Sequence, residues 1–251
     1  MLPKSLRRVL RPLDVRPDRY RGPLARLAHG LAVAAERKEI TAEGLLDRFR
    51  SALEETDVGT EFARWLDPWP AGRPVDYWLC RRRPRRGRRT LAMGLQLFHL
   101  GAGRSEPPHH HNQMASLQCV VRGEIVCRQY QRVARHGGDV VTIRPVSQRT
   151  LGEGETFRMT DHENNVHWFG TEARPAVILD FFVEGRGLYE KPFDPDPARP
   201  LGRQYLDPTA PPDGGGLIAG RELSPAEAYR RFAGMRLSAF DWPGRCLPVG
   251  R

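Results

Sequence analysis

Short segments with alternating apolar and polar residues dominate the chain after Pro74, and they constrain its fold more than any other feature. In Thr90–His99, every second residue from Leu91 to Leu97 is a large apolar one, as expected for a strand with one buried face. Further strands are predicted at 116–121, 124–130, 139–144, 156–159 and 176–183. Short strands at close spacing, separated by Gly and Pro, predict a mainly β fold, either an antiparallel barrel or a sandwich.

Two segments before Pro74 have helical periodicity instead. Apolar residues recur on one stripe in Pro23–Arg37 and again in Ala42–Leu53, which predicts two amphipathic helices. A short third helical turn is expected at 59–65. Residues 1–20 are rich in Arg and Pro and are expected to form an extended arm.

Proline dominates the segment Lys191–Gly216, which is therefore expected to form a long irregular wrap. One helix should follow, with Ser224 as its N-cap, Pro225 at the first position and Glu227 completing a capping box. The chain is thus divided into an N-terminal arm and helical layer (1–74), a β barrel (75–190), and a C-terminal wrap with a short helix (191–251).

The net charge of +10 raises the question of nucleic-acid binding. Of the 40 basic residues only Lys4, Lys38 and Lys191 are lysines, and the one dense cluster is Arg81–Arg89. No aromatic ladder or recognition-helix pattern accompanies that cluster, so we interpret it as a solvated turn. No apolar run is long enough to span a membrane, and the basic N-terminus has no apolar segment behind it. We therefore expect a cytoplasmic protein that binds neither nucleic acid nor membrane; its oligomeric state is left open.

The four cysteines form no C-x-x-C pair, and we expect four reduced thiols. Arg122-Gly123 is interpreted as the turn of a β-hairpin between 116–121 and 124–130. In that hairpin the sulfurs of Cys119 and Cys127 would point to opposite faces and could not form a disulfide.

Histidines mark the candidate site. If His109–His111 is extended, the side chains of His109 and His111 share one face and His110 points to the other. His167 lies between Val166 and Trp168 at the start of a predicted strand, whereas His162 lies in a polar loop. Two histidines on one face suggest a metal site, and the alternative for His167 is a packed core histidine.

The two segments together resemble the cupin superfamily. Gly103, the triplet His109–His111, Ser116 and Gly123 match the spacing of its first motif, G-x5-H-x-H-x(3,4)-E-x6-G, and His167 lies at the last histidine of the second. The resemblance covers about residues 75–190. It implies a double-stranded β-helix (jelly-roll) barrel whose metal ligands are His109, His111 and His167.

Ser116 stands where most cupins have a glutamate ligand. In this respect the chain is similar to the cysteine dioxygenase and thiol dioxygenase branch, in which three histidines hold Fe(II) and O2 oxidises a small thiol to a sulfinate. Two departures weaken the resemblance: Ile178, Asp180 and Phe182 lie where that branch has a Ser-His-Tyr triad, and its cysteine–tyrosine crosslink cannot form. The branch's carboxylate-binding arginine corresponds to Arg83 or, with a shift, to Arg81, which implies a preference for a thiol with a carboxylate.

Two further residues are candidates from the strand pattern. Gln118 should face the metal together with Ser116 and could bind substrate or oxygen; the alternative is a partly exposed strand glutamine. Asp180 is a carboxylate in an apolar strand and needs a partner, either a ligand histidine that it orients or an arginine. Other functions remain open: a cupin with another divalent metal that cleaves carbon–carbon bonds or isomerises its substrate, or a non-enzymatic metal-binding sensor.

Overall fold

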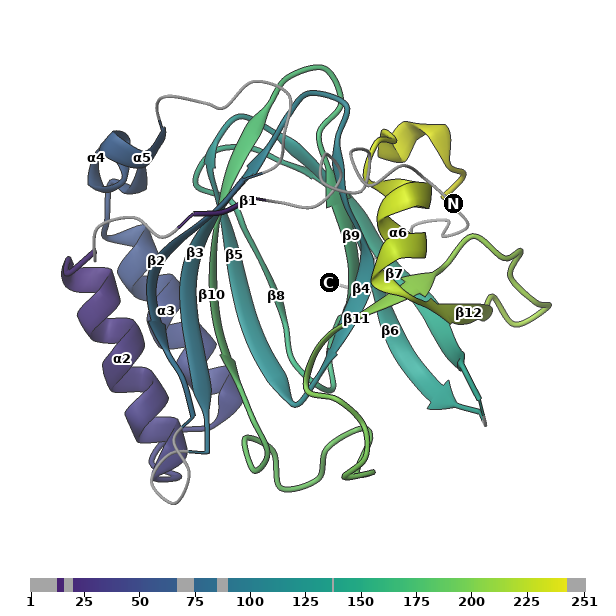
Figure 1. Cartoon of the computed structure of the whole chain (residues 1–251), viewed down its shortest axis with the longest axis horizontal. Coiled ribbons are helices and arrows are strands. Elements are labelled where there is room, and N and C mark those ends of the chain that lie inside the picture. The colour runs from purple at the N-terminus through teal and green to yellow at the C-terminus, as the bar shows by residue number, and fades with distance from the viewer. Residues whose placement is uncertain (1–12, 16–19, 67–74, 85–89, 137, 243–251) are drawn as a thin grey trace, which may run out of the picture.

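The computed structural model describes residues 13–15, 20–66, 75–84, 90–136 and 138–242 (Figure 1). The N-terminal part of this range forms the helices α2 (Pro23–Glu36), α3 (Ala42–Glu54), α4 (Val58–Glu61) and α5 (Ala63–Leu66). The Thr41 side chain caps α3 by accepting a hydrogen bond from the Gly44 amide, which satisfies one of the amides at the helix start. None of the described helices is long and apolar enough to cross a membrane.

The first of two β-sheets lies against these helices (Figure 1). Its strand order is β1 (Leu13–Val15), β2 (Val75–Arg82), β3 (Ala92–Leu100), β10 (Ala176–Glu184), β5 (Met114–Arg122) and β8 (Thr156–Met159). The central pairs β3–β10 and β10–β5 are antiparallel. The predicted strands at 90–99, 116–121, 156–159 and 176–183 are therefore confirmed and lie in one sheet.

The second sheet closes on itself. Its order is β11 (Gly202–Asp207), β12 (Ile218–Leu223), β7 (Val140–Leu151), β6 (Ile125–Arg135), β9 (Val166–Gly170) and β4 (Ser105–Asn112), and β4 pairs again with β11. Two facing sheets of mostly antiparallel strands, between which the chain passes several times, form the jelly-roll barrel that the sequence predicted. The mainly β fold class is confirmed.

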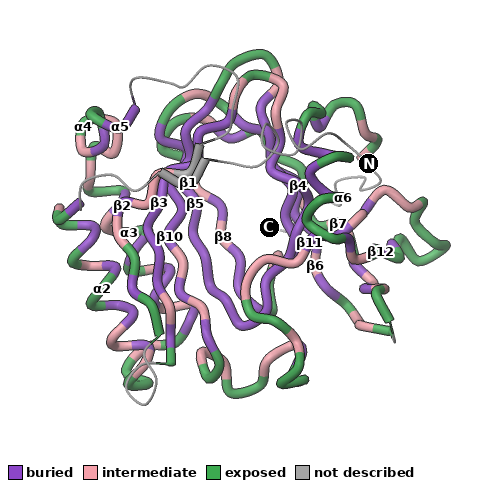
Figure 2. Tube along the Cα trace, in the orientation of Figure 1, coloured by how far each residue is buried: buried purple, intermediate pink, exposed green. Residues whose placement is uncertain are grey.

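Side chains of the first sheet alternate between two cores. Leu95, Leu117 and Phe181 point outward and pack with the helices, whereas Val120 and Ile178 point inward between the sheets. Figure 2 shows the central strands buried along most of their length, because helices cover one face and the second sheet covers the other. The same alternation sends the polar residues of these strands into the barrel.

The predicted hairpin at Arg122-Gly123 is wrong. β5 belongs to the first sheet and β6 to the second, so this turn carries the chain from one sheet to the other. Gly123 has φ +82°, and a Cβ there would lie 2.4 Å from the Pro175 carbonyl oxygen, so the crossover requires glycine. Cys119 and Cys127 are free thiols in different core clusters, as expected; Cys246 lies outside the described residues.

The irregular wrap predicted for 191–216 is also wrong in one essential part. Residues 202–207 form β11, which pairs antiparallel with β4 and closes the second sheet. The chain then forms β12 and helix α6 (Pro225–Phe232), followed by a 3-10 turn at Leu237–Ala239. The capping box of Ser224 and Glu227 is present as predicted.

Of the expected N-terminal arm, 13–15 pair in parallel with β2, and 1–12 and 16–19 lie outside the described residues.

Packing of α3 against the first sheet predicts a large stability effect at Phe49. Its ring stacks on that of Phe181 at a centroid distance of 4.0 Å, and both side chains are fully buried. We expect Phe49→Ala to lower the free energy of unfolding by about 3–5 kcal/mol in urea titrations. Val133→Ala, at an exposed position, is the control and should change it by about 0.5 kcal/mol or less. Similar values for the two variants would contradict this packing.

Candidate metal centre

Three histidines meet on the inner face of the second sheet. His109 and His111 lie on β4, and His167 lies on β9 directly opposite His109. One ring nitrogen from each lies within 4.8 Å of the others, and the Nε2 atoms of His109 and His167 are 2.6 Å apart. All three side chains are buried. The face alternation predicted from the sequence therefore brings these imidazoles to one point.

The protein prepares these rings to act as ligands. His109 Nδ1 lies 2.7 Å from the Pro107 carbonyl oxygen, to which it donates, so that Nε2 carries the lone pair. Burial lowers the pKa of His109 and of His111 well below the ordinary value, and that of His167 to about 3. All three imidazoles are consequently neutral near pH 7, which is the form that binds a metal ion.

The other two histidines of these segments lie elsewhere. His110 points away from the group: Arg132 donates to its Nδ1 at 3.2 Å, and its Nε2 lies 3.3 Å from Glu222. His162 is exposed, and its ring lies against Tyr189. Neither is among the three grouped ring nitrogens, in agreement with the sequence-based assignment of faces.

A row of polar side chains on the first sheet faces into the barrel. Asp180 on β10 accepts hydrogen bonds from Ser116 Oγ at 2.7 Å, Gln118 Nε2 at 3.0 Å and Gln96 Nε2 at 2.9 Å. Burial raises the pKa of Asp180, and the Ser116 hydroxyl is the largest of the opposing influences. The inward orientation of Ser116 and Gln118 was predicted. The partners of Asp180 were not: its hydrogen-bond donors among the described residues are these three neutral groups rather than an arginine or a ligand histidine.

A cavity of about 320 Å³ adjoins the histidines between the two sheets. It is lined by Trp78, Gln96, His111, Met114, Asp180, Phe182, Glu184, Gly202, Arg203 and Tyr205. A cavity of this size that reaches a candidate ligand could hold a small substrate. The group of three histidines therefore has both a buried donor set and a space beside it.

The guanidinium in this lining comes from a strand that the sequence reasoning missed. Arg203 on β11 lies directly opposite His111 on β4, and Tyr205 lies opposite His109. Arg203 forms an ion pair with the buried carboxylate of Glu106, which also accepts a hydrogen bond from Tyr229 on α6 at 3.2 Å. Arg203, Tyr205 and Asp207 are spaced two residues apart, as on one face of a strand, and this spacing could have indicated β11. The surrounding prolines favoured an irregular segment instead.

The two arginines proposed as a substrate anchor do not line this cavity. The Arg81 guanidinium lies over the Trp78 ring at 4.9 Å from its centroid, which places it beside the cavity wall. Arg83 is exposed beyond the end of β2. Their roles stay predictions; of the cluster at 81–89, residues 85–89 lie outside the described part of the chain.

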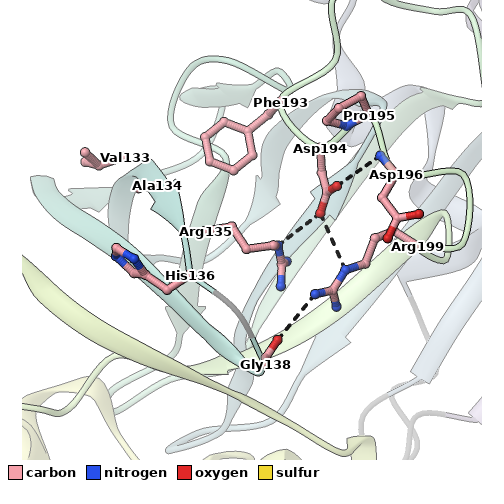
Figure 3. A pocket seen from close by; sticks show the side chains of 10 residues that line it. All are labelled: Val133, Ala134, Arg135, His136, Gly138, Phe193, Asp194, Pro195, Asp196 and Arg199. Carbon is pink, nitrogen blue, oxygen red and sulfur yellow. Dashed lines mark hydrogen bonds and ion pairs between the residues drawn. The ribbon is translucent and has the colours of Figure 1, made fainter.

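A second, larger hollow of about 500 Å³ lies away from His109, His111 and His167, between β6 and the segment before β11 (Figure 3). Its charged side chains bind one another: Asp194 pairs with Arg135 at 3.0 Å and with Arg199 at 3.6 Å, and Arg199 donates to the Gly138 carbonyl. Figure 3 shows these contacts joining the two walls. We interpret this network as a structural clamp that holds 193–199 against β6.

The comparisons with known proteins give distant structural likenesses. No family model matches the chain, and no curated protein is significantly similar to it. A protein with a double-stranded β-helix domain from Klebsiella pneumoniae is 14% identical, covering 47% of this chain and 84% of that one, with a TM-score of 0.33. A cupin superfamily protein from Desulfitobacterium hafniense is 12% identical (48% and 84%; 0.32), and Cellulomonas parahominis L-ribose isomerase is 20% identical (45% and 57%; 0.31). Likenesses this distant identify neither a family nor an activity, and the fold assignment depends on the strand order described above.

Five buried histidines predict a pH dependence of stability. Burial lowers the pKa of His99 and His110 to about 4 and that of His167 to about 3, and lowers those of His109 and His111 as well. Below the ordinary pKa of 6.5 the unfolded chain binds protons that the folded chain does not, so stability falls as pH falls, by up to about 1.4 kcal/mol per pH unit for each histidine. Denaturant titrations of metal-free protein at pH 7 and 5.5 should show this loss. His167→Ala should reduce the pH dependence of the free energy of unfolding by the contribution of one histidine. A free energy of unfolding that does not change with pH would contradict the burial of these histidines.

Substitution of single histidines tests the grouping itself. We expect His109→Ala, His111→Ala and His167→Ala each to abolish stoichiometric binding of a divalent metal, because each removes one of three neutral nitrogen donors. The measurement is metal content by mass spectrometry after anaerobic loading with Fe(II) and desalting. His162→Ala is the matched control and should retain the wild-type content. Full loading of the His111→Ala or His167→Ala variant would show that the three rings do not form one site.

Proposed function

We propose that the protein is a metal-dependent cupin enzyme in which His109, His111 and His167 hold Fe(II), and that it oxidises a small thiol to a sulfinate with O2. The observation that carries this proposal is a buried group of three neutral imidazoles that includes no carboxylate. The donor set fits a divalent ion, because the ring nitrogens face one another and the His109 tautomer leaves Nε2 free for coordination.

The absence of a carboxylate from the group favours an anionic substrate atom. The nearest equivalent position, Ser116, is engaged with Asp180, and the Asp180 carboxylate is not part of the group of ligand atoms. Three imidazoles leave the full positive charge of a divalent ion, whereas a carboxylate ligand would offset part of it. A thiolate supplies that negative charge and is the form of a thiol that metal ions bind.

The cavity beside His111 provides the place where substrate would lie. Its walls would hold the thiol beside His111, and a fixed orientation of the reacting groups lowers the barrier to reaction. Ferrous iron, when bound, supplies the activation of dioxygen. The overall change is RS⁻ + O2 → RSO2⁻, so both oxygen atoms enter the product and no external reductant is needed. Gln118 and Asp180 form one wall of the barrel interior, where Gln118 holds Asp180 in place.

One observation favours a second candidate, another metal-dependent reaction of the same fold. The carboxylates of Asp180 and Glu184 both line the cavity, and burial raises the pKa of each. A carboxyl group with a raised pKa accepts and returns protons at a higher pH than an ordinary carboxyl group does. An isomerase or a carbon–carbon lyase that uses zinc, nickel or manganese would employ them in this way, without consuming oxygen.

Oxygen uptake distinguishes the two candidates. Protein loaded anaerobically with Fe(II) should consume one O2 per thiol and release the sulfinate, identified by a mass increase of two oxygen atoms. Protein loaded with Zn(II) should consume none, and His109→Ala should lose the activity. If no thiol in a panel of charged and uncharged small thiols is oxidised by fully iron-loaded protein, the dioxygenase proposal is wrong and the second candidate is favoured.

A further inference from the structure

Three residues of β10 present alternating side chains to the cavity. Asp180, Phe182 and Glu184 all belong to its lining, as the two-residue repeat of a strand requires. Asp180 is held by three neutral donors. The half-buried Glu184 carboxylate, by contrast, forms no hydrogen bond or ion pair with the other described residues, although the Arg203 guanidinium in the same lining opposes the rise in its pKa that burial causes. It is therefore an acceptor directed at the cavity.

The guanidinium of the cavity cannot neutralise all of these carboxylates. Arg203 forms its ion pair with Glu106, which is buried and is also bound by the Tyr229 hydroxyl. The cavity lining and the ion pair of Arg203 thus bring together three carboxylates, those of Glu106, Asp180 and Glu184, and one guanidinium. The Arg81 guanidinium also lies over the Trp78 ring, but it is exposed and outside the lining. Burial raises the pKa of all three carboxyl groups, and a positive charge in the cavity would favour their ionised forms. A bound divalent metal would balance the excess, but a thiolate substrate would then add a negative charge.

The wall next to Glu184 is suited to a cation. The rings of Trp78 and Phe182 lie edge to face at a centroid distance of 6.1 Å, and both line the cavity. The faces of aromatic rings attract ammonium groups, and a carboxylate beside them adds a charge-assisted hydrogen bond. Gly94 makes this arrangement possible, because a Cβ there would lie 2.3 Å from the Phe182 ring.

We propose that Glu184 is a specificity-determining residue that binds an ammonium group of the substrate, so that the enzyme takes aminothiols in preference to mercaptocarboxylates. This inference rests on the proposed thiol oxidation at the three histidines. An aminothiolate brings one negative and one positive charge into the cavity and leaves its balance unchanged, whereas a mercaptocarboxylate adds two negative charges. The preference is opposite to the one expected for an anchor at Arg81 or Arg83.

The test compares three thiols of similar length: cysteamine, 2-mercaptoethanol and 3-mercaptopropionate. For the iron-loaded wild type, kcat/KM for cysteamine should exceed that for the other two by about tenfold or more, as one charge-assisted contact contributes. Glu184→Gln keeps the shape and removes the charge, and should reduce the cysteamine to 2-mercaptoethanol ratio at least about tenfold. Glu190→Gln, an exposed glutamate outside the cavity, is the matched control and should keep the ratio.

Anaerobic calorimetric titration of each thiol into the same proteins provides a readout besides turnover. Cysteamine should bind more tightly than 2-mercaptoethanol to the wild type, and this difference should disappear in Glu184→Gln. If no thiol is oxidised but the binding difference is present, the dioxygenase proposal fails and the role of Glu184 stands. Equal or better use and binding of 3-mercaptopropionate by the wild type, or an equal loss for all three thiols in Glu184→Gln, would overturn the inference.

Discussion

The pairing of β4 with strands on both sides is the interaction on which the site depends. β9 places His167 opposite His109, and β11 places Arg203 opposite His111. A shift of one residue in either register would turn these side chains to the other face of the sheet. The register is fixed by buried contacts on both faces, among them the Arg132 and Glu222 contacts of His110 on the outer side. The position of the donor set is thus a consequence of strand pairing.

Much of this arrangement could be predicted because it depends on local periodicity. Alternation identified the central strands, and the spacing of His109 and His111 placed both rings on one face. The predictions that failed concern long-range strand pairing. Arg122-Gly123 has the sequence of a hairpin turn, but the two strands that it joins belong to different sheets. Local sequence does not specify which distant strand forms hydrogen bonds with the free edge of a given strand. For that reason β11, which lies between prolines and pairs with β4, was not predicted.

The same limit explains which site residues were found. The histidines, Ser116 and Gln118 lie on strands with a clear pattern, so their inward orientation was predictable. Arg203 and Tyr205 reach the cavity only because β11 closes the second sheet, and Glu184 lies at the end of β10, one residue beyond the predicted strand. The charge of the cavity depends on which charged side chains the fold brings together. Arg203 forms an ion pair with Glu106, and the charge of the cavity follows from that pairing rather than from the net charge of the chain.

The central claim is that three neutral imidazoles hold the metal and leave a position for a thiolate. X-ray absorption spectroscopy of the iron-loaded protein, recorded under nitrogen before and after addition of cysteamine, tests it most directly. The account predicts three imidazole nitrogen ligands together with weak oxygen ligands from water, and the appearance of one sulfur ligand when the thiol is added. A protein carboxylate in the first coordination shell, or an unchanged spectrum at saturating thiol, would contradict it.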